Sequence, residues 1–425
     1  MKRIVVLVTI AALAVVAALT ASVYVASGGT AVRVSVSPAL SALDQPIRIA
    51  VHGLAPGELA TMRLRSVDST GISWASVATF RADGAGTVDL DAAAPVSGAY
   101  SGVWGMGLIA MMRSPATPTR PDPARAYFWH GTKAQTFQLS VRSQGRELAS
   151  KTFRRRLTAR PVRIEQQQLS DHGFVGEWFA PSHSGRRPAV LAIGGSEGGD
   201  LGLFLDSDVL AANDYPTLDI AYFKAPGLPN WLANIRLEYF AKALQWLRRQ
   251  PGVDPSRIIV LGASRGSEAA QLLGVYYPNL VHAVIATSPA NVALCDYPFC
   301  VAPAWTLHGK PLPYTHQLND PHPTDNPAAV IPVERIQGPI FLACGGKDTV
   351  WVSCEYAHAI MNRLDDHHDR YPHVLQEEPK AGHHVDDLTP YEPLAIGNDP
   401  ADEMAREKIW PHFLRFLAAF AHAPR

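Results

Sequence analysis

The sequence has no excess of charge of either sign. Lys plus Arg and Asp plus Glu each total 38 among 425 residues, so the formal net charge is zero. It also has no basic run of the density that nucleic-acid binding needs, and a basic surface supplies most of the affinity of proteins for nucleic acid. We therefore expect no nucleic-acid partner. Hydrophobic residues make up 47% of the chain and charged residues 18%, which excludes a disordered protein and predicts a globular one of two or three domains.

Cysteine is scarce, and no Cys/His cluster has the spacing of zinc ligands, so we expect no metal. The four cysteines are Cys295, Cys300, Cys344 and Cys354. In an oxidising compartment they would form two disulfides, with three possible pairings. Their positions in the sequence favour the two local pairs, although sequence alone leaves the pairing open.

The N-terminus carries the one long hydrophobic run. Lys2 and Arg3 precede an almost unbroken apolar stretch from Ile4 to Ala26. Its length is near the ~20 residues that span a bilayer and exceeds the core of a typical signal peptide. Residues 1–30 are predicted to be a signal peptide or a membrane anchor, and cleavage is left open. By the positive-inside rule, the rest of the chain is then exported or membrane-anchored outside the cytoplasm.

Residues 31–160 predict an immunoglobulin-like β-sandwich. Short runs of alternating apolar and polar residues are separated by turns with Gly or Pro, as in antiparallel sheets. The runs are Val32–Val36, Ile47–Val51, Met62–Ser66, Ser76–Phe80, Thr87–Leu90 and Thr136–Val141. No constellation here suggests chemistry. The basic run Arg154–Arg156 is interpreted as a solvated face.

Residues 161–425 predict an α/β fold with a mostly parallel, doubly wound sheet. Continuous apolar runs indicate strands buried on both faces, and helical patterns at Leu232–Arg249 and Ser267–Tyr276 lie between them. The runs are Ala189–Ile193, Thr217–Tyr222, Ile258–Leu261, Val281–Ala286 and Ile340–Cys344. Asn291–Ile336 has little periodicity, and a loop of this length predicts a lid-like insertion.

The strongest motif is Gly262-Ala263-Ser264-Arg265-Gly266, between a predicted strand and a predicted helix. In the α/β-hydrolase fold, small neighbours allow a sharp turn that exposes the serine above the sheet. Ser264 is therefore predicted to be the nucleophile. The alternative, a turn serine without a role, does not explain both flanking glycines.

A serine nucleophile needs a base, and in this fold the chain order is Ser, then Asp or Glu, then His. Asp348 follows a buried strand and is the predicted acid. His383 comes directly after Gly382 and is the predicted base, with His384 as its rival.

Two backbone amides should stabilise the oxyanion. One is predicted to come from Arg265, and the other from Ser196 or Glu197 in the loop Gly194–Gly199. This loop lacks the Lys-Ser/Thr ending of a P-loop and the spacing of a dinucleotide fingerprint. We therefore expect no bound cofactor.

The chain also resembles the acyl-CoA thioesterase and bile acid-CoA:amino acid N-acyltransferase family. The stretches that carry the resemblance are Leu43–Ile47, Val51–Gly57, Phe80–Leu90, Gly98–Leu108, Gly262–Gly266, Gly346–Asp348 and Gly382–His383. The resemblance covers nearly all of the chain after the hydrophobic run. It implies a sandwich followed by a hydrolase domain, and acyl transfer from a thioester through an acyl-enzyme.

The resemblance implies a small acyl thioester or ester as substrate and hydrolysis as the leading activity. Conjugating members often carry Cys as nucleophile, so Ser264 favours hydrolysis over transfer to an amine. The alternatives are an N-acyltransferase, an extracytoplasmic esterase or peptidase, and a non-catalytic binding module. Familiar members lack a leading hydrophobic run, so an exported member is expected to use a thioester, ester or amide other than acyl-CoA. The sequence does not indicate the oligomeric state.

Overall fold

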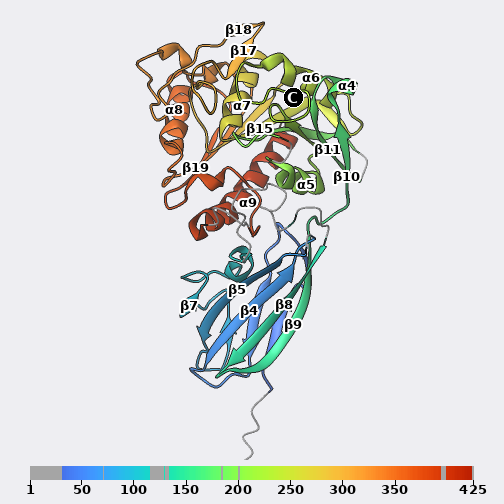
Figure 1. Ribbon diagram of the computed structural model, residues 1–425, viewed down its shortest axis with the longest axis vertical. Coiled ribbons are helices and arrows are strands. Elements are labelled where there is room, and N and C mark those ends of the chain that lie inside the picture. The colour runs from blue at the N-terminus through green and yellow to red at the C-terminus, as the bar shows by residue number, and fades with distance from the viewer. Residues whose placement is uncertain are drawn as a thin grey trace, which may run out of the picture.

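The computed structural model describes residues 31–69, 71–114, 129, 134–182, 185–199, 202–393 and 399–423. The predicted signal peptide or anchor, residues 1–30, lies outside them. Within these ranges, no helix combines the length and the apolar character needed to cross a bilayer. Figure 1 shows two domains stacked along the long axis, with the N-terminal domain below the C-terminal one.

The N-terminal domain is a β-sandwich. One sheet has the strand order β2-β9-β8-β4-β5-β7 and the other β1-β3-β6. Burial alternates along the central strands, so one side of each sheet faces a shared core, as a period of two requires. The elements are β1 (Arg33–Ser37), β2 (Leu40–Ala42), β3 (Arg48–His52), β4 (Leu59–Val67), β5 (Ser73–Arg81), β6 (Val88–Asp89), β7 (Ser97–Gly98), α2 (Gly107–Ala110), β8 (Ala134–Ser143) and β9 (Arg146–Arg156).

The basic run of β9 is not a fully solvated face. Arg154 and Arg156 are exposed, but Arg155 between them is fully buried. The alternation of the strand turns Arg155 inward, and its guanidinium donates to the carbonyl oxygens of Ala42 and Leu43 at 2.9 and 2.8 Å. The prediction of a solvated face is therefore wrong for Arg155, because a buried cation can be satisfied by backbone carbonyls.

The C-terminal domain contains an eight-stranded sheet in the order β10-β11-β13-β12-β15-β16-β19-β20. If these eight strands are numbered along the chain, their order across the sheet is 1-2-4-3-5-6-7-8. All neighbours from β13 to β20 pair in parallel. The strands are β10 (Val162–Gln167), β11 (Val175–Pro181), β12 (Arg187–Ile193), β13 (Thr217–Ala221), β15 (Val253–Ala263), β16 (Ala283–Thr287), β19 (Ile340–Gly345) and β20 (Val374–Glu378).

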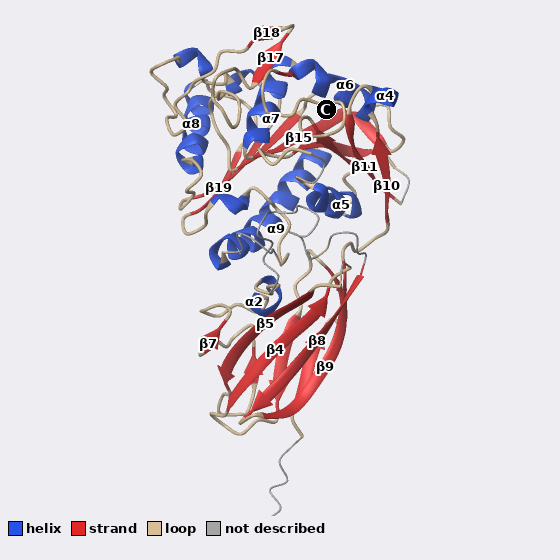
Figure 2. Ribbon diagram, viewed as in Figure 1, coloured by secondary structure: helices blue, strands red, loops and turns tan. Residues whose placement is uncertain are grey.

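Helices cover both faces of this sheet (Figure 2). Val190 and Leu261 contribute to the core on the side of α5 and α9, and Leu191 and Val260 to the core on the side of α6, α7 and α8. The remaining elements are α4 (Leu169–His172), α5 (Phe204–Ala212), β14 (Ile235–Arg236), α6 (Leu237–Leu247), α7 (Arg265–Tyr276), β17 (Trp305–Leu307), β18 (Lys310–Pro311), η1 (Pro327–Ala329), η2 (Val333–Arg335), α8 (Ser353–Asp366), η3 (His383–Val385) and α9 (Pro400–His422).

The two domains share one hydrophobic core through α9. The cluster that fills the sandwich also contains α9 residues such as Trp410 and Phe413. Trp104 of the sandwich donates from its indole nitrogen to Glu407 of α9 at 2.6 Å. Asn213 donates to Asp44 across the same junction at 3.0 Å. The sandwich therefore supports the hydrolase domain from below the sheet, on the side of α9 (Figure 1).

The predicted helix Leu232–Arg249 differs in its bounds from the observed one. The helix expected from Leu232 starts later, because Ile235–Arg236 forms the short strand β14 beside β17 and α6 begins at Leu237. The predicted insertion 291–336 contains only β17, β18 and two 3₁₀ turns, as its weak periodicity suggested. Its first residues, 291–296, are buried. A lid role for the insertion stays a prediction.

Candidate active site

Ser264 occupies a strained turn, the elbow Gly262–Gly266, between β15 and α7. Its φ of 50° and ψ of −119° are unfavourable for a residue with a side chain, and such strain is typical of functional sites. A Cβ on Gly262 would lie 2.2 Å from the carbonyl oxygen of Gly266, and a Cβ on Gly266 would lie 2.2 Å from that of Ile193. Both glycines are therefore required by the close approach of helix and strand.

The structure brings Ser264, His383 and Asp348 together. His383 Nε2 lies 3.0 Å from Ser264 Oγ, and His383 Nδ1 lies 2.8 Å from Asp348 Oδ2. The side chains of His383 and Asp348 are only 10% and 2% exposed. Three residues separated by up to 119 positions thus form one hydrogen-bonded chain that can pass a proton from the serine to the imidazole.

The loop that carries His383 is held in place by residues that follow β16 and β19. The hydroxyl of Ser288 donates to the carbonyl oxygen of His383 at 2.6 Å, and the ring of Trp351 packs edge-on against the imidazole at 5.7 Å. The rival His384 is 47% exposed, and its Nδ1 lies 3.8 Å from Asp386 Oδ1. The geometry therefore favours His383 over His384 as the base.

Opposing effects act on the two titrating groups. Burial lowers the pKa of His383, but the hydrogen bond to Asp348 and the charges of Asp386 and Asp348 outweigh it and raise the net pKa above its usual value. Burial raises the pKa of Asp348, but the hydrogen bond and positive charge of His383 outweigh it and lower the net pKa. The pair is thus set for an ionised acid behind an imidazole that is more basic than usual.

A disulfide closes the turn that presents Asp348. Cys344 at the end of β19 is bonded to Cys354 at the start of α8, ten residues further on. Within that loop, Asp348 Oδ1 accepts backbone N–H groups of Val350 and Trp351 at 2.9 and 3.2 Å. The acid is therefore fixed by its own turn and by a covalent link.

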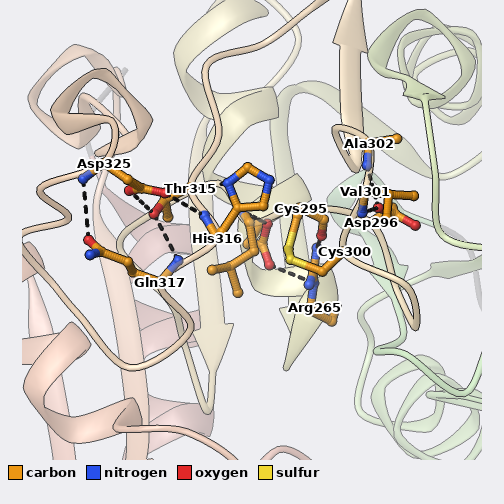
Figure 3. Close-up of a disulfide and its surroundings, with 12 residues drawn as sticks. Arg265, Cys295, Asp296, Cys300, Val301, Ala302, Thr315, His316, Gln317 and Asp325 are labelled. Atoms are coloured by element: carbon orange, nitrogen blue, oxygen red, sulfur yellow. Dashed lines mark hydrogen bonds and ion pairs between the residues drawn. A yellow bond between two sulfur atoms is a disulfide. The ribbon is translucent and has the colours of Figure 1, made fainter.

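The second disulfide joins Cys295 and Cys300 beside Arg265, as Figure 3 shows. Both local pairings expected from sequence are thus present. Arg265 donates from Nη2 to the carbonyl oxygen of Cys295 at 2.8 Å and forms a buried ion pair with Glu268. The side chain of the residue after the nucleophile therefore connects the elbow to the insertion, while its backbone amide begins α7.

The predicted oxyanion loop approaches the elbow through Gly195. A Cβ on Gly195 would lie 3.0 Å from Ser264 Cβ and 2.9 Å from the Glu197 carboxyl, so a larger residue would have to displace these neighbours. Tyr222 donates to the carbonyl oxygens of Gly194 and Gly195 at 3.0 and 2.8 Å and fixes the loop. Sequence reasoning missed this role of Gly195, although a residue without a side chain is the one that can pack against the serine.

Glu197 has a side chain that turns back onto its own loop. The residue is exposed overall, yet its carboxyl accepts the Gly195 N–H at 2.7 Å and packs against Gly194 and Gly202. Burial of this carboxyl group raises its pKa to about 7. The choice of Arg265 with Ser196 or Glu197 as amide donors stays a prediction. Among the described residues, no group of three or more His, Cys, Asp or Glu is placed to hold a metal.

The elbow with Ser264, the turn with Asp348 and the loop with His383 follow the fifth, seventh and eighth strands of this sheet in chain order. A Ser–Asp–His order at the carboxyl ends of such a sheet, with the serine on a strand-to-helix turn, defines the α/β-hydrolase fold. Two family models then match the chain. They are the acyl-CoA thioester hydrolase/BAAT N-terminal region over residues 44–168 and the BAAT/acyl-CoA thioester hydrolase C-terminal region over residues 235–420.

The chain therefore belongs to the acyl-CoA thioester hydrolase/bile acid-CoA:amino acid N-acyltransferase family. It is 30% identical to acyl-coenzyme A thioesterase 3 of Mus musculus over 371 residues, which cover 83% of this chain and 82% of the relative. It is 29% identical to acyl-coenzyme A thioesterase 6 of Mus musculus over 86% of this chain and 88% of the relative. Mitochondrial acyl-coenzyme A thioesterase 2 of Homo sapiens is 28% identical over 83% of this chain and 73% of its own.

Proposed function

We propose that this protein hydrolyses acyl thioesters through a covalent acyl-enzyme on Ser264. The observation that carries the proposal is the position of His383, 3.0 Å from Ser264 Oγ and 2.8 Å from Asp348. The relatives named above are acyl-coenzyme A thioesterases, and this supports a thioester as the substrate class.

In the acylation half, His383 Nε2 accepts the proton of Ser264 as Oγ attacks the thioester carbonyl. The C–S bond breaks when the tetrahedral intermediate collapses, and His383 returns the proton to the leaving thiolate. Asp348 holds the imidazole in the tautomer with the proton on Nδ1 and stabilises its charged form. The amides of Arg265 and of Ser196 or Glu197 are proposed to stabilise the oxyanion.

In the deacylation half, His383 accepts a proton from water, the resulting hydroxide attacks the acyl carbonyl, and the C–O bond to Ser264 breaks. The proton returns to Ser264 and a free carboxylic acid leaves. An alkoxide is a poorer leaving group than a thiolate, so a serine acyl-enzyme is expected to react more slowly with water than it forms. This makes the intermediate accessible to trapping.

We also propose that the body of the chain, residues 31–425, lies outside the cytoplasm, either exported or held to the membrane by residues 1–30. Two disulfides support this, because disulfides persist in oxidising compartments. In that location the substrate would be a thioester, ester or amide other than intracellular acyl-CoA. Protease accessibility of the body in intact cells, compared with lysed cells, tests the location. Protection in intact cells would contradict it.

The activity test is a substrate panel run on the wild type and on Ser264→Ala. The panel contains acyl-CoAs of several chain lengths, acyl thioesters of small thiols, and p-nitrophenyl esters. We expect thioester turnover by the wild type and a loss of about 10⁴-fold or more in Ser264→Ala. Ser267→Ala, one turn into α7, is a matched control that removes a buried hydroxyl from the same helix.

Two outcomes would overturn the proposal. Near-normal turnover by a folded Ser264→Ala protein would exclude Ser264 as the nucleophile. Turnover of peptides or esters with no turnover of any thioester would assign the site to a different hydrolase activity.

A further inference from the structure

A second carboxylate faces the imidazole from the side of the nucleophile. Asp386 Oδ2 lies 3.8 Å from His383 Nε2, the nitrogen that contacts Ser264, whereas Asp348 binds the opposite nitrogen. The other oxygen of Asp386 accepts the N–H of Asp387 at 3.1 Å. The hydroxyl of Thr287 donates to the Asp386 carbonyl oxygen at 2.7 Å. Asp386 is therefore held with one free oxygen toward the reacting nitrogen.

Asp386 lies beside the position that the acceptor of the acyl group must occupy. Once Ser264 is acylated, the acceptor has to hydrogen bond to His383 Nε2, at about 2.6–3.2 Å, to lose its proton. The separation of 3.8 Å between His383 Nε2 and Asp386 Oδ2 is short enough for one water molecule to bond to both. Water has two hydrogens, so it can donate one to each group.

Carboxyl groups and basic side chains both lie near Asp386. Burial is the main cause of the raised pKa of Glu197, and the charge of Asp386 raises it further, so the two carboxyls interact. His384 Nδ1, at 3.8 Å, is the nearby base on the outer side, and Lys224 is bound to the Glu197 carbonyl oxygen. The negative charge of Asp386 disfavours an acceptor that carries a carboxylate, whereas a neutral acceptor such as water meets no such repulsion.

We propose that Asp386 selects water over carboxylate-bearing amines as the acyl acceptor, by orienting the water on His383 and by repelling the carboxylate of an amino acid. This inference rests on the proposed function of the Ser264 site. It assigns a specificity-determining residue to the second half of the reaction. It also gives a physical reason for hydrolysis in a family that includes N-acyltransferases.

In the deacylation step, one water molecule bridges His383 and Asp386. The water donates one hydrogen to His383 Nε2 and the other, as a hydrogen bond, to Asp386. Its oxygen forms the new bond to the acyl carbon while the first proton moves to Nε2. The C–O bond to Ser264 then breaks and the proton on His383 passes to Ser264 Oγ. Asp386 accepts a hydrogen bond in this step and takes no proton.

The test measures how one acyl-enzyme divides between water and added amines. Each enzyme turns over a thioester with glycine or with glycinamide, which lacks the carboxylate, and the acid and amide products are quantified by mass spectrometry. The variants are Asp386→Asn, Asp386→Ala and the exposed control Glu355→Gln. The product ratio does not depend on the folded fraction or on the acylation rate, so impaired folding cannot mimic the effect.

For the wild type, with each amine counted as its unprotonated form, we expect hydrolysis to dominate and glycinamide to be favoured over glycine by about tenfold, as expected for repulsion between two nearby charges. Asp386→Asn and Asp386→Ala should reduce this preference to within about threefold and lower the hydrolysed fraction. Glu355→Gln should behave as the wild type. An unchanged preference in both Asp386 variants, or no conjugation of either amine by them, would overturn the inference.

Failure of the proposed function gives a different result from failure of this inference alone. If acid-quenched wild-type protein carries no acyl group on Ser264, the mechanism fails and this inference fails with it. If Ser264 is acylated but the acceptor preference is independent of residue 386, only the inference fails.

Discussion

The two domains differ in where they place polar side chains. Along β4 and β5 of the sandwich, buried and exposed residues alternate, and the buried ones are mostly apolar. Along β13, β16 and β19 of the hydrolase sheet, every residue is buried. The hydrolase domain places its reactive groups just beyond the carboxyl ends of β15, β19 and β20, at Ser264, Asp348 and His383. A sheet covered on both faces supports these groups, and the chemistry is confined to the carboxyl ends of its strands.

This difference predicts that substitutions at the carboxyl ends of the hydrolase strands remove activity without unfolding the chain. Substitutions in the sandwich core are predicted to destabilise the chain without removing activity. The two adjacent histidines give the largest expected contrast. His383→Ala should lower kcat/KM by about 10⁴–10⁶-fold, because the base is lost, while His384→Ala should cost less than about tenfold. Steady-state kinetics on both purified variants measure this. Equal losses would contradict the assignment of His383.

Asp348→Asn is expected to lower kcat by about 10⁴-fold. Its pH profile adds a second readout. The wild-type rate falls as pH drops through the raised pKa of His383, since a protonated imidazole cannot accept the serine proton. The hydrogen bond and charge of Asp348 help to raise that pKa, so the variant's acidic limb should move to lower pH. A limb that stays in place would argue that Asp348 does not act on His383.

Phe137→Ala tests the sandwich side of the comparison. Phe137 is fully buried and stacks on Phe153 at 5.3 Å, and removing such a ring costs about 3–5 kcal/mol of unfolding free energy. Because α9 links the two domains, the melting temperature of the whole chain should fall, while kcat measured well below it stays within about twofold of wild type. A large loss of kcat in folded protein would show that the sandwich takes part in chemistry.

The double variant Cys344→Ser/Cys354→Ser links the two sides of the comparison. Opening a loop of this size costs about 2–3 kcal/mol in the chain-entropy model. It should also reduce kcat, because the same loop presents Asp348. Thermal unfolding and kinetics on one preparation measure both effects. A stability loss with unchanged kcat would mean that the hydrogen bonds within the turn hold Asp348 without the disulfide.

Glu197→Gln should have the smallest effect, below about 1 kcal/mol, because solvent reaches much of the residue. The pKa of Glu197 is raised from 4.5 to about 7 in the folded state, so the folded protein binds this proton more tightly than the unfolded one. The contribution to stability is therefore complete below 4.5 and is lost as pH rises toward 7. The variant should lose this part of the pH dependence in unfolding curves at pH 5 and pH 8.

Much of the fold and of the site was predictable from periodicity and glycine placement. The strand-to-helix turn at Ser264 was predictable because each flanking glycine is required by a backbone contact. The pairing of His383 with Ser264 followed from chain order, and the two local disulfides followed from spacing. These features depend on residues close in sequence or on an order that the fold imposes.

The features that sequence did not reveal depend on contacts between distant segments. Arg155 is buried because carbonyl groups from the segment around Ala42 and Leu43 meet it, and no local pattern encodes that meeting. Gly195 packs on Ser264 and Asp386 faces His383 only after the sheet is assembled. The start of α6 was misplaced because Ile235 pairs with Trp305, seventy residues away, in a two-residue strand.

The most direct test of the account is to trap the acyl-enzyme. Wild-type protein is mixed with an excess of an acyl thioester, quenched with acid within the first turnovers, digested, and analysed by mass spectrometry. We predict a single acyl adduct on the peptide that contains Ser264, absent in Ser264→Ala and accumulating in Asp386→Ala, where deacylation is slowed. An adduct on another residue, or full thioester turnover by Ser264→Ala with no adduct, would contradict the assignment of Ser264 as the nucleophile.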